Sequence, residues 1–348
     1  MSKTNSGNFF EDFKLNQIIR HATPRTLTHG DAAVYQALYG SRFSLQCSDV
    51  TGRAVGYSQA PIDDLLVFHT AFGKSVPDVS LNAVANLGYA NGRFMAQVFP
   101  GDTITAYSEV IGLKENSSGE TGVVYVRTYG ENQDGHGVID YVRWVMVRKR
   151  DKASPAPEPT VPQLPARVSP DQLVVPRHFS MNPWNVVRSG SPYFFDDYEV
   201  GEKIDHEVGM TVEEAEHMMA TRLYQNTARV HFDQYTEGKN RFGRRLVYGG
   251  HIISIARSLS FNGLGNAVRL VGINGGQHVA PCFGGDTVFA WTEVLEKAEV
   301  DRSDVGALRL RTIATKDLPC ADFPGRKEKG HDDGVILDFD YWVLIPKR

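Results

Sequence analysis

The sequence predicts an α+β fold in which two copies of one unit follow each other along 348 residues, each an antiparallel sheet around one long apolar helix. Residues 9–13 (FFEDF) recur as residues 194–198 (FFDDY). Residues 87–110 recur as residues 271–294 at nearly the same offset, 184 residues instead of 185. Agreement between two separated blocks indicates an internal duplication.

The first copy is expected to hold two helices. Thr28 and Asp31 show a capping pattern at the start of the first. The second is predicted to run from Pro61 to Gly73, with apolar residues at helical spacing between them. Proline at the start and glycine at the end is the usual asymmetry of a helix.

The second copy is expected to repeat this arrangement. Thr211 and Glu214 have the spacing of a capping box at the start of a short helix. A more apolar helix is predicted to follow Gly249 and Gly250, and Gly263 can end it.

Each predicted sheet comes after its helices. Segments rich in β-branched and aromatic residues, with Gly, Asn and Asp between them, lie at residues 103–111, 122–129, 141–147, 287–295, 307–315 and 337–345. Successive strands without intervening helices favour antiparallel pairing, and they argue against a doubly wound parallel sheet.

Composition limits the classes of function. The formal net charge is −4 with mixed signs and no basic stripe, so a nucleic-acid partner is not expected. No apolar run is long enough for a membrane span, and the first residues lack a signal core. The three cysteines lie far apart in the sequence, which is typical of reduced thiols in the cytoplasm.

A proline-rich segment separates the copies. Residues 151–170 lack apolar periodicity and are expected to run extended over the surface. We therefore expect an N-terminal domain at 1–150, a linker at 151–190 and a C-terminal domain at 191–348.

The loop YQNTARVHFD, at residues 224–233, is the first candidate site. A single histidine near a helix end is more often structural than catalytic. In the aligned segment of the first copy, however, Gln46 stands opposite His231 and Ser41 stands opposite Asn226. The histidine is thus absent from one copy, which indicates that the C-terminal domain reacts. The N-terminal domain is then a degenerate copy that supports the fold or cradles the substrate.

The turn VYGGH at residues 247–251 is the second candidate site. Free N–H groups of Gly249 and Gly250, at the positive end of a helix dipole, can hold an oxygen that gains negative charge. The alternative interpretation is a plain tight turn before a helix.

Three arginines precede this turn, at positions 241, 244 and 245. They can meet phosphates of a nucleotide-bearing substrate, although solvated loop charges are the commoner case. The run His331, Asp332 and Asp333 lacks a further group with metal-ligand spacing. Neither a P-loop nor a dinucleotide fingerprint occurs, so no metal and no separate cofactor are expected.

The order of these features resembles that of the MaoC-like, (R)-specific enoyl-CoA hydratases. That family has a loop of the form DxNPxHxD, then a VHG turn, then FVGD, for which this chain has FGGD at residues 283–286. His231 and Asp233 match the loop, while Asn226, Ala228 and Arg229 replace its Asp, Asn and Pro. The resemblance implies the hotdog fold, here a double hotdog with one working half.

The resemblance also implies roles for individual residues. In the family the acidic residue and the histidine hold the attacking water together, and Gly249 would give the backbone N–H for the thioester oxygen. Asn226 is no carboxylate base, so proton transfer falls to His231, with Asn226 orienting the water and Asp233 supporting the imidazole. The side chains expected to contact the substrate are those of Gln225, Arg229, Asp233, Arg244, Arg245 and Tyr248.

Over nearly its whole length the chain is similar to a narrower branch, the mesaconyl-CoA hydratases or β-methylmalyl-CoA dehydratases, notably in NFFEDF, RLYQNTARVHFD and FGRRLVYGGHIIS. This resemblance implies reversible hydration of mesaconyl-CoA (2-methylfumaryl-CoA), a step of ethylmalonyl-CoA-type acetate assimilation. CoA is then part of the substrate, and a homo-oligomer is expected. Arg229 would pair with the free carboxylate of the substrate.

Alternatives remain open. The first alternative to mesaconyl-CoA hydration is an (R)-specific hydratase for another enoyl-CoA. The second is an acyl-CoA thioesterase that attacks through Asp233, and the third is a non-catalytic acyl-CoA-binding protein. The last alternative is motivated by Asn226 at the acidic position.

Overall fold

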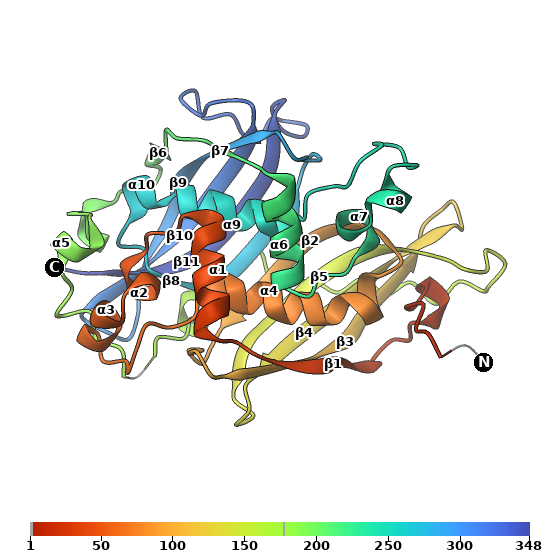
Figure 1. Cartoon of the computed structure of the whole chain (residues 1–348), viewed down its shortest axis with the longest axis horizontal. Coiled ribbons are helices and arrows are strands. Elements are labelled where there is room, and N and C mark those ends of the chain that lie inside the picture. Colours follow the sequence, from red (N-terminus) through yellow and green to blue (C-terminus); the bar gives the residue numbers. More distant parts are fainter. Residues whose placement is uncertain (1–2, 177) are drawn as a thin grey trace.

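The computed structural model describes residues 3–176 and 178–348 and contains two units of the same kind (Figure 1). The strands of the first unit are β1 (Ile18–Thr26), β2 (Ala83–Phe94), β3 (Thr103–Glu115), β4 (Thr121–Glu131) and β5 (Gly137–Arg148). Its helices are η1 (Phe10–Asp12), α1 (His29–Tyr39), α2 (Ser44–Cys47), α3 (Asp49–Ala54), α4 (Asp64–Ser75) and the π-helical η2 (Val76–Ser80).

The second unit repeats this order. Its strands are β6 (Lys203–Asp205), β7 (Met210–Thr211), β8 (Arg269–His278), β9 (Thr287–Glu299), β10 (Val305–Lys316) and β11 (Val335–Pro346). Its helices are η4 (Phe195–Asp197), α6 (Glu214–Leu223), α7 (Arg229–Phe232), α8 (Gln234–Glu237), α9 (Gly249–Leu259) and α10 (Phe261–Leu264). The segment between the units holds η3 (Pro170–Gln172) and α5 (Val186–Ser189).

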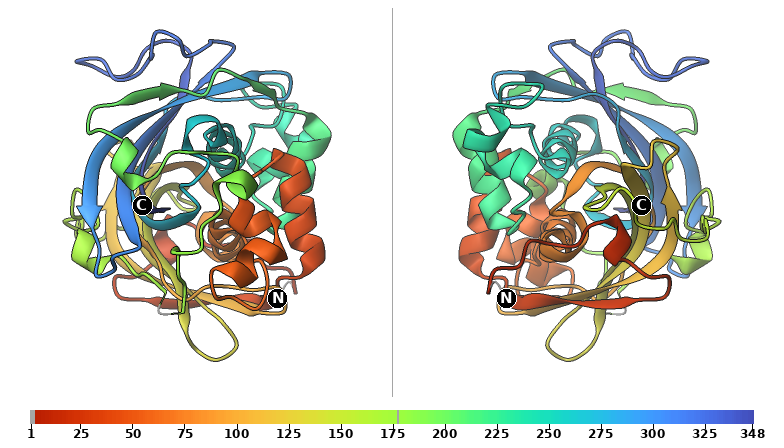
Figure 2. Two further views of the ribbon diagram at one scale, coloured as in Figure 1. Left: turned by 90° about the vertical axis from the view of Figure 1, so that its left-hand side faces the viewer. Right: turned by 90° about the vertical axis from the view of Figure 1, so that its right-hand side faces the viewer.

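All described strands belong to one sheet with the order β1-β3-β4-β5-β2-β8-β11-β10-β9-β6, and β7 pairs with β9. Neighbouring strands are antiparallel, so the predicted fold class is confirmed. Figure 2 shows the sheet curved around α4 and α9, with α1 and α6 on its open side. None of the described helices is long and apolar enough to cross a membrane.

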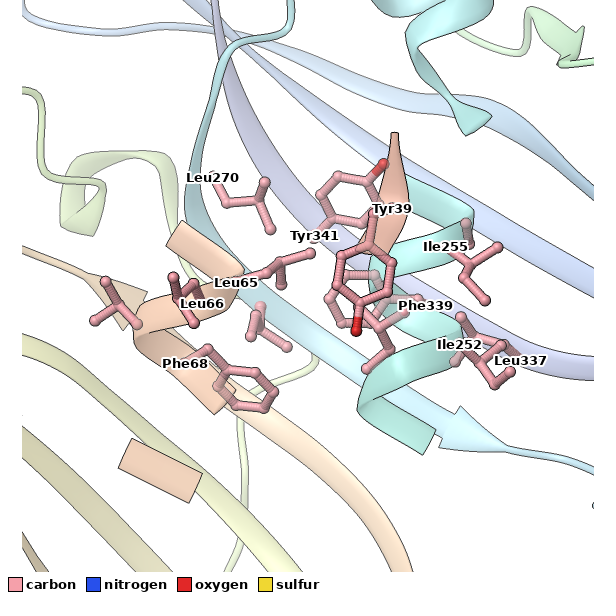
Figure 3. Packing of buried hydrophobic residues seen from close by; sticks show 14 of the residues in the cluster. Tyr39, Leu65, Leu66, Phe68, Ile252, Ile255, Leu270, Leu337, Phe339 and Tyr341 are labelled. Atoms are coloured by element: carbon pink, nitrogen blue, oxygen red, sulfur yellow. The ribbon is translucent and has the colours of Figure 1, made fainter. Parts of the chain in front are cut away.

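The two units share one hydrophobic core. Figure 3 shows Leu65 and Phe68 of α4 in the same cluster as Ile252 and Ile255 of α9. Phe339 of β11 closes this cluster from the sheet. Because the cluster spans both units, neither central helix buries its apolar face within its own half alone.

Strands β2 and β8 join the two units, and the sequence interpretation assigned neither as a strand. Each contains several glycines, which break the pattern of β-branched residues. The glycines allow close packing at this junction: a Cβ on Gly92 would lie 2.9 Å from Ile273 Cβ, and one on Gly276 would lie 2.8 Å from Tyr89 Cδ2. The glycines that weaken the strand pattern in the sequence thus allow the two strands to pair.

The helix boundaries confirm some sequence predictions and correct others. Thr28 caps α1, accepting from Asp31 N, while Asp31 accepts from Thr28 N at 2.8 Å. The capping box predicted at Thr211 is wrong, because Thr211 pairs in β7 and α6 begins at Glu214 without a side-chain cap. Helix α4 begins after Asp63, not at Pro61, and continues beyond its predicted end to Ser75.

Buried side chains repeat the duplication in detail. In one unit a histidine and two hydroxyl residues form a hydrogen-bonded chain, and the other unit has its counterpart; the chains are His21, Ser108, Thr128 and His206, Thr292, Thr312. The Asp of the GD motif also has the same role in both units. Asp102 accepts from Phe99 N at 2.7 Å and Asp286 accepts from Phe283 N at 2.9 Å, so the motif forms the turn that starts a strand.

The segment between the units is only partly a surface linker. It is largely exposed over residues 151–167, as predicted. From Val168 onward it packs against the second unit, because Val168 N donates to Asn274 Oδ1 at 2.8 Å and Trp342 Nε1 donates to Val168 O at 3.0 Å. Phe179 and Met181 are buried in the same cluster.

Candidate active site

The loop between α6 and α7 rests on helix α4 of the first unit. A Cβ on Gly73 would lie 2.8 Å from the carbonyl carbon of Tyr224, still closer to its oxygen, and 3.3 Å from Asn226 N. Gly73 was predicted to end a helix, but it lies inside α4 and allows the loop backbone to touch it. Lys74 Nζ next to it donates to Gln225 Oε1 at 3.5 Å. The first unit therefore determines where the loop lies.

Asn226 is 1% exposed, and its side chain is only partly satisfied. Its Oδ1 accepts from Ala228 N at 3.2 Å. Its Nδ2 is enclosed and has no hydrogen-bond partner among the described residues. A buried amide donor without a partner is costly, which favours a water or substrate oxygen as its missing acceptor.

His231 is held by the backbone of the segment before the glycine turn. Its Nδ1 bonds to Leu246 O at 2.8 Å, and because a carbonyl only accepts, Nδ1 carries the proton. In the neutral ring Nε2 is then an acceptor, and it bonds to no described residue. Burial lowers the pKa of His231 to about 4, opposed by the hydrogen bond to Leu246. The imidazole is therefore a neutral base at pH 7.

Asp233 does not support this imidazole. It caps α8, where its carboxylate accepts from Thr236 N at 3.2 Å and from the Thr236 hydroxyl at 2.5 Å. These hydrogen bonds hold the pKa of Asp233 below its usual value, although burial opposes them. The expected support comes instead from the carbonyl of Leu246, which no side-chain pattern in the sequence could indicate.

The glycine turn opens α9 without a side-chain cap among the described residues. At the equivalent position of the first unit, Asp63 caps α4 by accepting from Leu65 N at 2.9 Å. The first amides of α4 are thus partly satisfied by a side chain, whereas no described side chain caps those of Gly249 and Gly250. Tyr248 N is fixed separately, since it donates to His217 Nε2 at 3.0 Å.

Two histidines near the turn escaped the sequence interpretation. The ring of His217 lies 6.3 Å from that of His231, between ring centroids. His278, the last residue of β8, packs on Gly249, where a Cβ would lie 2.6 Å from its Cδ2. The repeat contained a signal for both, because His217 aligns with Ala32 and His278 aligns with Phe94.

The predicted arginines are distributed around the loop. Arg245 forms an ion pair with Glu214 at 2.5 Å, so its charge is already matched. Arg244 donates to Gly284 O and lies over the ring of Phe283, 4.8 Å from its centroid. Arg229 is exposed on α7, two residues before the candidate histidine.

The run at His331, which the sequence analysis considered as a metal site, forms a local hydrogen bond. His331 Nε2 lies 3.1 Å from Asp338 Oδ2. The described part of the chain has no group of three or more His, Cys, Asp or Glu side chains placed to hold a metal ion.

The continuous sheet, the two enclosed helices and the site at one glycine turn define a double hotdog protein of the MaoC-like class. A MaoC domain protein dehydratase from Chloroflexus aurantiacus J-10-fl superposes with a TM-score of 0.98 at 60% identity, over 100% of both chains. A protein of Mycobacterium tuberculosis with a double hotdog fold superposes with a TM-score of 0.76 at 25% identity, over 97% of this chain and 98% of the other.

Sequence comparison gives the family within this class. The mesaconyl-CoA hydratase family matches residues 1–177. A β-methylmalyl-CoA dehydratase of Chloroflexus aurantiacus is 61% identical, over 100% of this chain and 99% of its own. A mesaconyl-CoA hydratase of Cereibacter sphaeroides is 57% identical, over 99% of this chain and 100% of its own. The chain belongs to the mesaconyl-CoA hydratase family.

Proposed function

We propose that this protein is a hydro-lyase that reversibly hydrates mesaconyl-CoA (2-methylfumaryl-CoA) to β-methylmalyl-CoA. The relatives at 61% and 57% identity are named for the two directions of this reaction. The observation that carries the proposal is the pairing of a neutral base with an uncapped helix start. His231 offers Nε2 as an acceptor, and no described side chain caps the first amides of α9 next to Tyr248, whose ring centroid lies 5.4 Å from that of His231.

The proposed reaction begins with a water between His231 and Asn226. Asn226 Nδ2 donates to the water oxygen, while His231 Nε2 accepts its proton as the oxygen adds to the β-carbon. The electron pair of the double bond moves toward the thioester oxygen. There the N–H groups of Gly249 and Gly250 stabilise the charge, and one such donor is generally worth about 10²- to 10³-fold in rate. The protonated histidine then returns its proton to the α-carbon.

Arg229 is proposed to pair with the free carboxylate of mesaconyl-CoA. It is exposed on α7, next to the catalytic loop, and forms no ion pair with another described residue, although it lies in the field of Asp233. Arg229→Ala is expected to raise KM for mesaconyl-CoA far more than for crotonyl-CoA, which lacks that carboxylate. Equal losses on both substrates would remove Arg229 from this role.

The two domains are proposed to divide the work. Residues 191–348 carry the chemistry, and residues 1–150 place the loop through Gly73 and Lys74. Gln46, opposite the catalytic histidine, donates to Val268 O at 2.6 Å and so serves the packing between units. The remaining proposed contacts are those of Gln225 and Tyr248 with the acyl group and of Arg244 with CoA phosphates; Arg245 is paired with Glu214 and would have to exchange that partner.

The cellular setting belongs to the same proposal. The substrate is an acyl-CoA thioester, and CoA leaves with the product, so no separate cofactor takes part. Cys47, Cys282 and Cys320 are free thiols, a state typical of the reducing cytoplasm. Assembly into a homo-oligomer is proposed from the resemblance, and light scattering of the purified protein tests it.

The decisive experiment is incubation with mesaconyl-CoA, with mass detection of a hydrated CoA ester. Loss of enoyl absorbance without release of free thiol supports hydration, whereas thiol release would support a thioesterase. His231→Ala should fold and lose hydration. Binding of CoA esters by the wild type without any turnover would refute the proposed function.

A further inference from the structure

Two of the histidines around the glycine turn differ from the others in accessibility. His217 and His251 are each 1% exposed, so they belong to the core. His231 and His278 are only half-buried. Both of these imidazoles are partly accessible beside one turn, where a substrate can contact them. The proposed reaction uses only His231.

The hydrogen bond to Tyr89 fixes which nitrogen of His278 carries the proton. Tyr89 is 1% exposed, and its hydroxyl lies 3.2 Å from His278 Nε2. A buried hydroxyl donates its hydrogen where an acceptor is in reach. Among the described residues, the acceptor within reach of the Tyr89 hydroxyl is His278 Nε2. Burial raises the pKa of Tyr89, which keeps this hydrogen in place. Tyr89 therefore donates to Nε2, and the neutral ring carries its proton on Nδ1.

The two accessible histidines thus have opposite tautomers. His231 donates from Nδ1 to Leu246 O and offers an acceptor at Nε2. His278 accepts at Nε2 and offers a donor at Nδ1. Burial, with a smaller effect of the neighbouring His231, lowers the pKa of His278 to about 4, so the ring is neutral at pH 7. One histidine is built to take a proton and the other to donate a hydrogen bond.

His278 also lies against the residue whose amide is proposed to receive the negative charge. Its ring packs against the first residue of α9, because a Cβ on Gly249 would lie 2.6 Å from its Cδ2 and closer still to Cε1 and Nε2. Glycine at position 249 is thus required by the imidazole as well as by the helix start. The ring remains at this place because Tyr89, from strand β2 of the other unit, anchors it.

We propose that His278 is a further catalytic residue, whose Nδ1–H donates to the thioester oxygen of the substrate together with the amides of Gly249 and Gly250. The inference rests on the proposed hydration. As water oxygen bonds to the β-carbon and His231 takes the proton, the electron pair of the double bond shifts to the thioester oxygen. His278 keeps its proton throughout and stabilises that oxygen. The proton on His231 then moves to the α-carbon, which restores the thioester.

Three substitutions of His278 separate the two ring nitrogens. Asparagine places its amide nitrogen near the position of Nδ1, whereas glutamine reaches toward that of Nε2. His278→Ala is expected to lower kcat about 10²- to 10³-fold, equally for mesaconyl-CoA and crotonyl-CoA, with little change in KM. His278→Asn should retain at least about tenfold more activity than His278→Gln, because one donor is restored. His29→Ala, at an exposed position, is the matched control and should keep the wild-type rate.

A second variant tests the tautomer without removing the ring. Tyr89→Phe deletes the hydroxyl bonded to His278 Nε2, which keeps the proton of the ring on Nδ1, so kcat should fall about tenfold on both substrates. Circular dichroism and thermal unfolding establish that each variant is folded.

Several results would overturn the inference. A wild-type kcat in folded His278→Ala would do so, as would equal rates for the Asn and Gln variants. A loss restricted to mesaconyl-CoA would place His278 on the second carboxylate instead of the thioester oxygen. These outcomes are distinct from failure of the proposed function, in which the wild type itself hydrates neither CoA ester.

Discussion

Replacing Gly73 by alanine tests whether the first unit places the catalytic loop. The added Cβ would lie 2.8 Å from the carbonyl carbon of Tyr224. Carbon atoms in contact keep about 3.5–4.0 Å, and the Tyr224 oxygen would lie closer still, so loop and helix must separate by at least about 1 Å. The displaced backbone runs directly into Asn226, whose own N–H is 3.3 Å from the same Cβ position.

Such a shift should affect catalysis much more than folding. Overpacking costs roughly 1–3 kcal/mol, while alanine in a helix interior recovers about 1 kcal/mol over glycine, so the free energy of unfolding should fall by at most about 2 kcal/mol. A displacement of 1 Å at a reacting group can lower the rate about 10²-fold. We therefore expect Gly73→Ala to remain folded and to lose about 10²-fold in kcat for mesaconyl-CoA, measured by loss of enoyl absorbance.

Gly30→Ala supplies the matched control, because Gly30 also lies in a helix. Its Cβ would meet only Thr28 Oγ1, at an ordinary 3.4 Å. This variant should keep the wild-type kcat and be up to about 1 kcal/mol more stable. If folded Gly73→Ala hydrates mesaconyl-CoA as fast as Gly30→Ala does, the loop does not depend on this contact and the reasoning is refuted.

Three further predictions concern protons and the helix cap. The acid limb of kcat/KM should lie near the lowered pKa of His231, about 4, because activity needs its neutral form; a midpoint near 6.5 in the pH–rate profile would contradict the base assignment. The buried histidines, His69, His206, His217 and His251, have pKa values lowered by burial to about 3, 4, 2 and 3, so the unfolded state binds more protons below pH 6.5. Stability should therefore be full above pH 6.5 and fall as the pH drops, by roughly 1 kcal/mol per histidine between pH 7.5 and 5.5; denaturant titrations that give the same free energy at both values would exclude this. Asp233→Ala should lower the melting temperature through loss of the α8 cap and leave hydration near the wild-type rate, whereas abolished turnover in a folded variant would favour a catalytic carboxylate.

The sequence predicted elements whose signal is local. Strands β3 to β5 and β9 to β11 were recognised because β-branched and aromatic residues concentrate in them. Strands β2 and β8 were missed because their glycines are required by close packing against the neighbouring strand, as between Gly92 and Ile273. Nothing within their own segments indicates this requirement. Gly73 was misread for the same reason, since the atom that requires glycine there lies 151 positions away in the sequence, at Tyr224.

The candidate site was predictable at positions where the two copies of the repeat carry different residues. His231 stood out because the first copy has Gln46, and the same comparison, extended to Phe94, would have singled out His278. The support of His231 by Leu246 O was beyond sequence reasoning, because every residue has a carbonyl. Asp233 illustrates the opposite error: it matches a family motif, yet its carboxylate caps the next helix.

The altered positions of the first copy help to explain why it was retained. Gln46, opposite the catalytic histidine, donates to Val268 O, and Asp64, opposite Gly249, accepts from Leu270 N at 3.0 Å. Both contacts hold the start of β8, and the other end of that strand presents His278 to the glycine turn. The positions that correspond to a second reaction site thus bind the strand that completes the first. Restoring histidine and glycine there would remove both hydrogen bonds, so the duplicated protein can keep one well-placed site more easily than two.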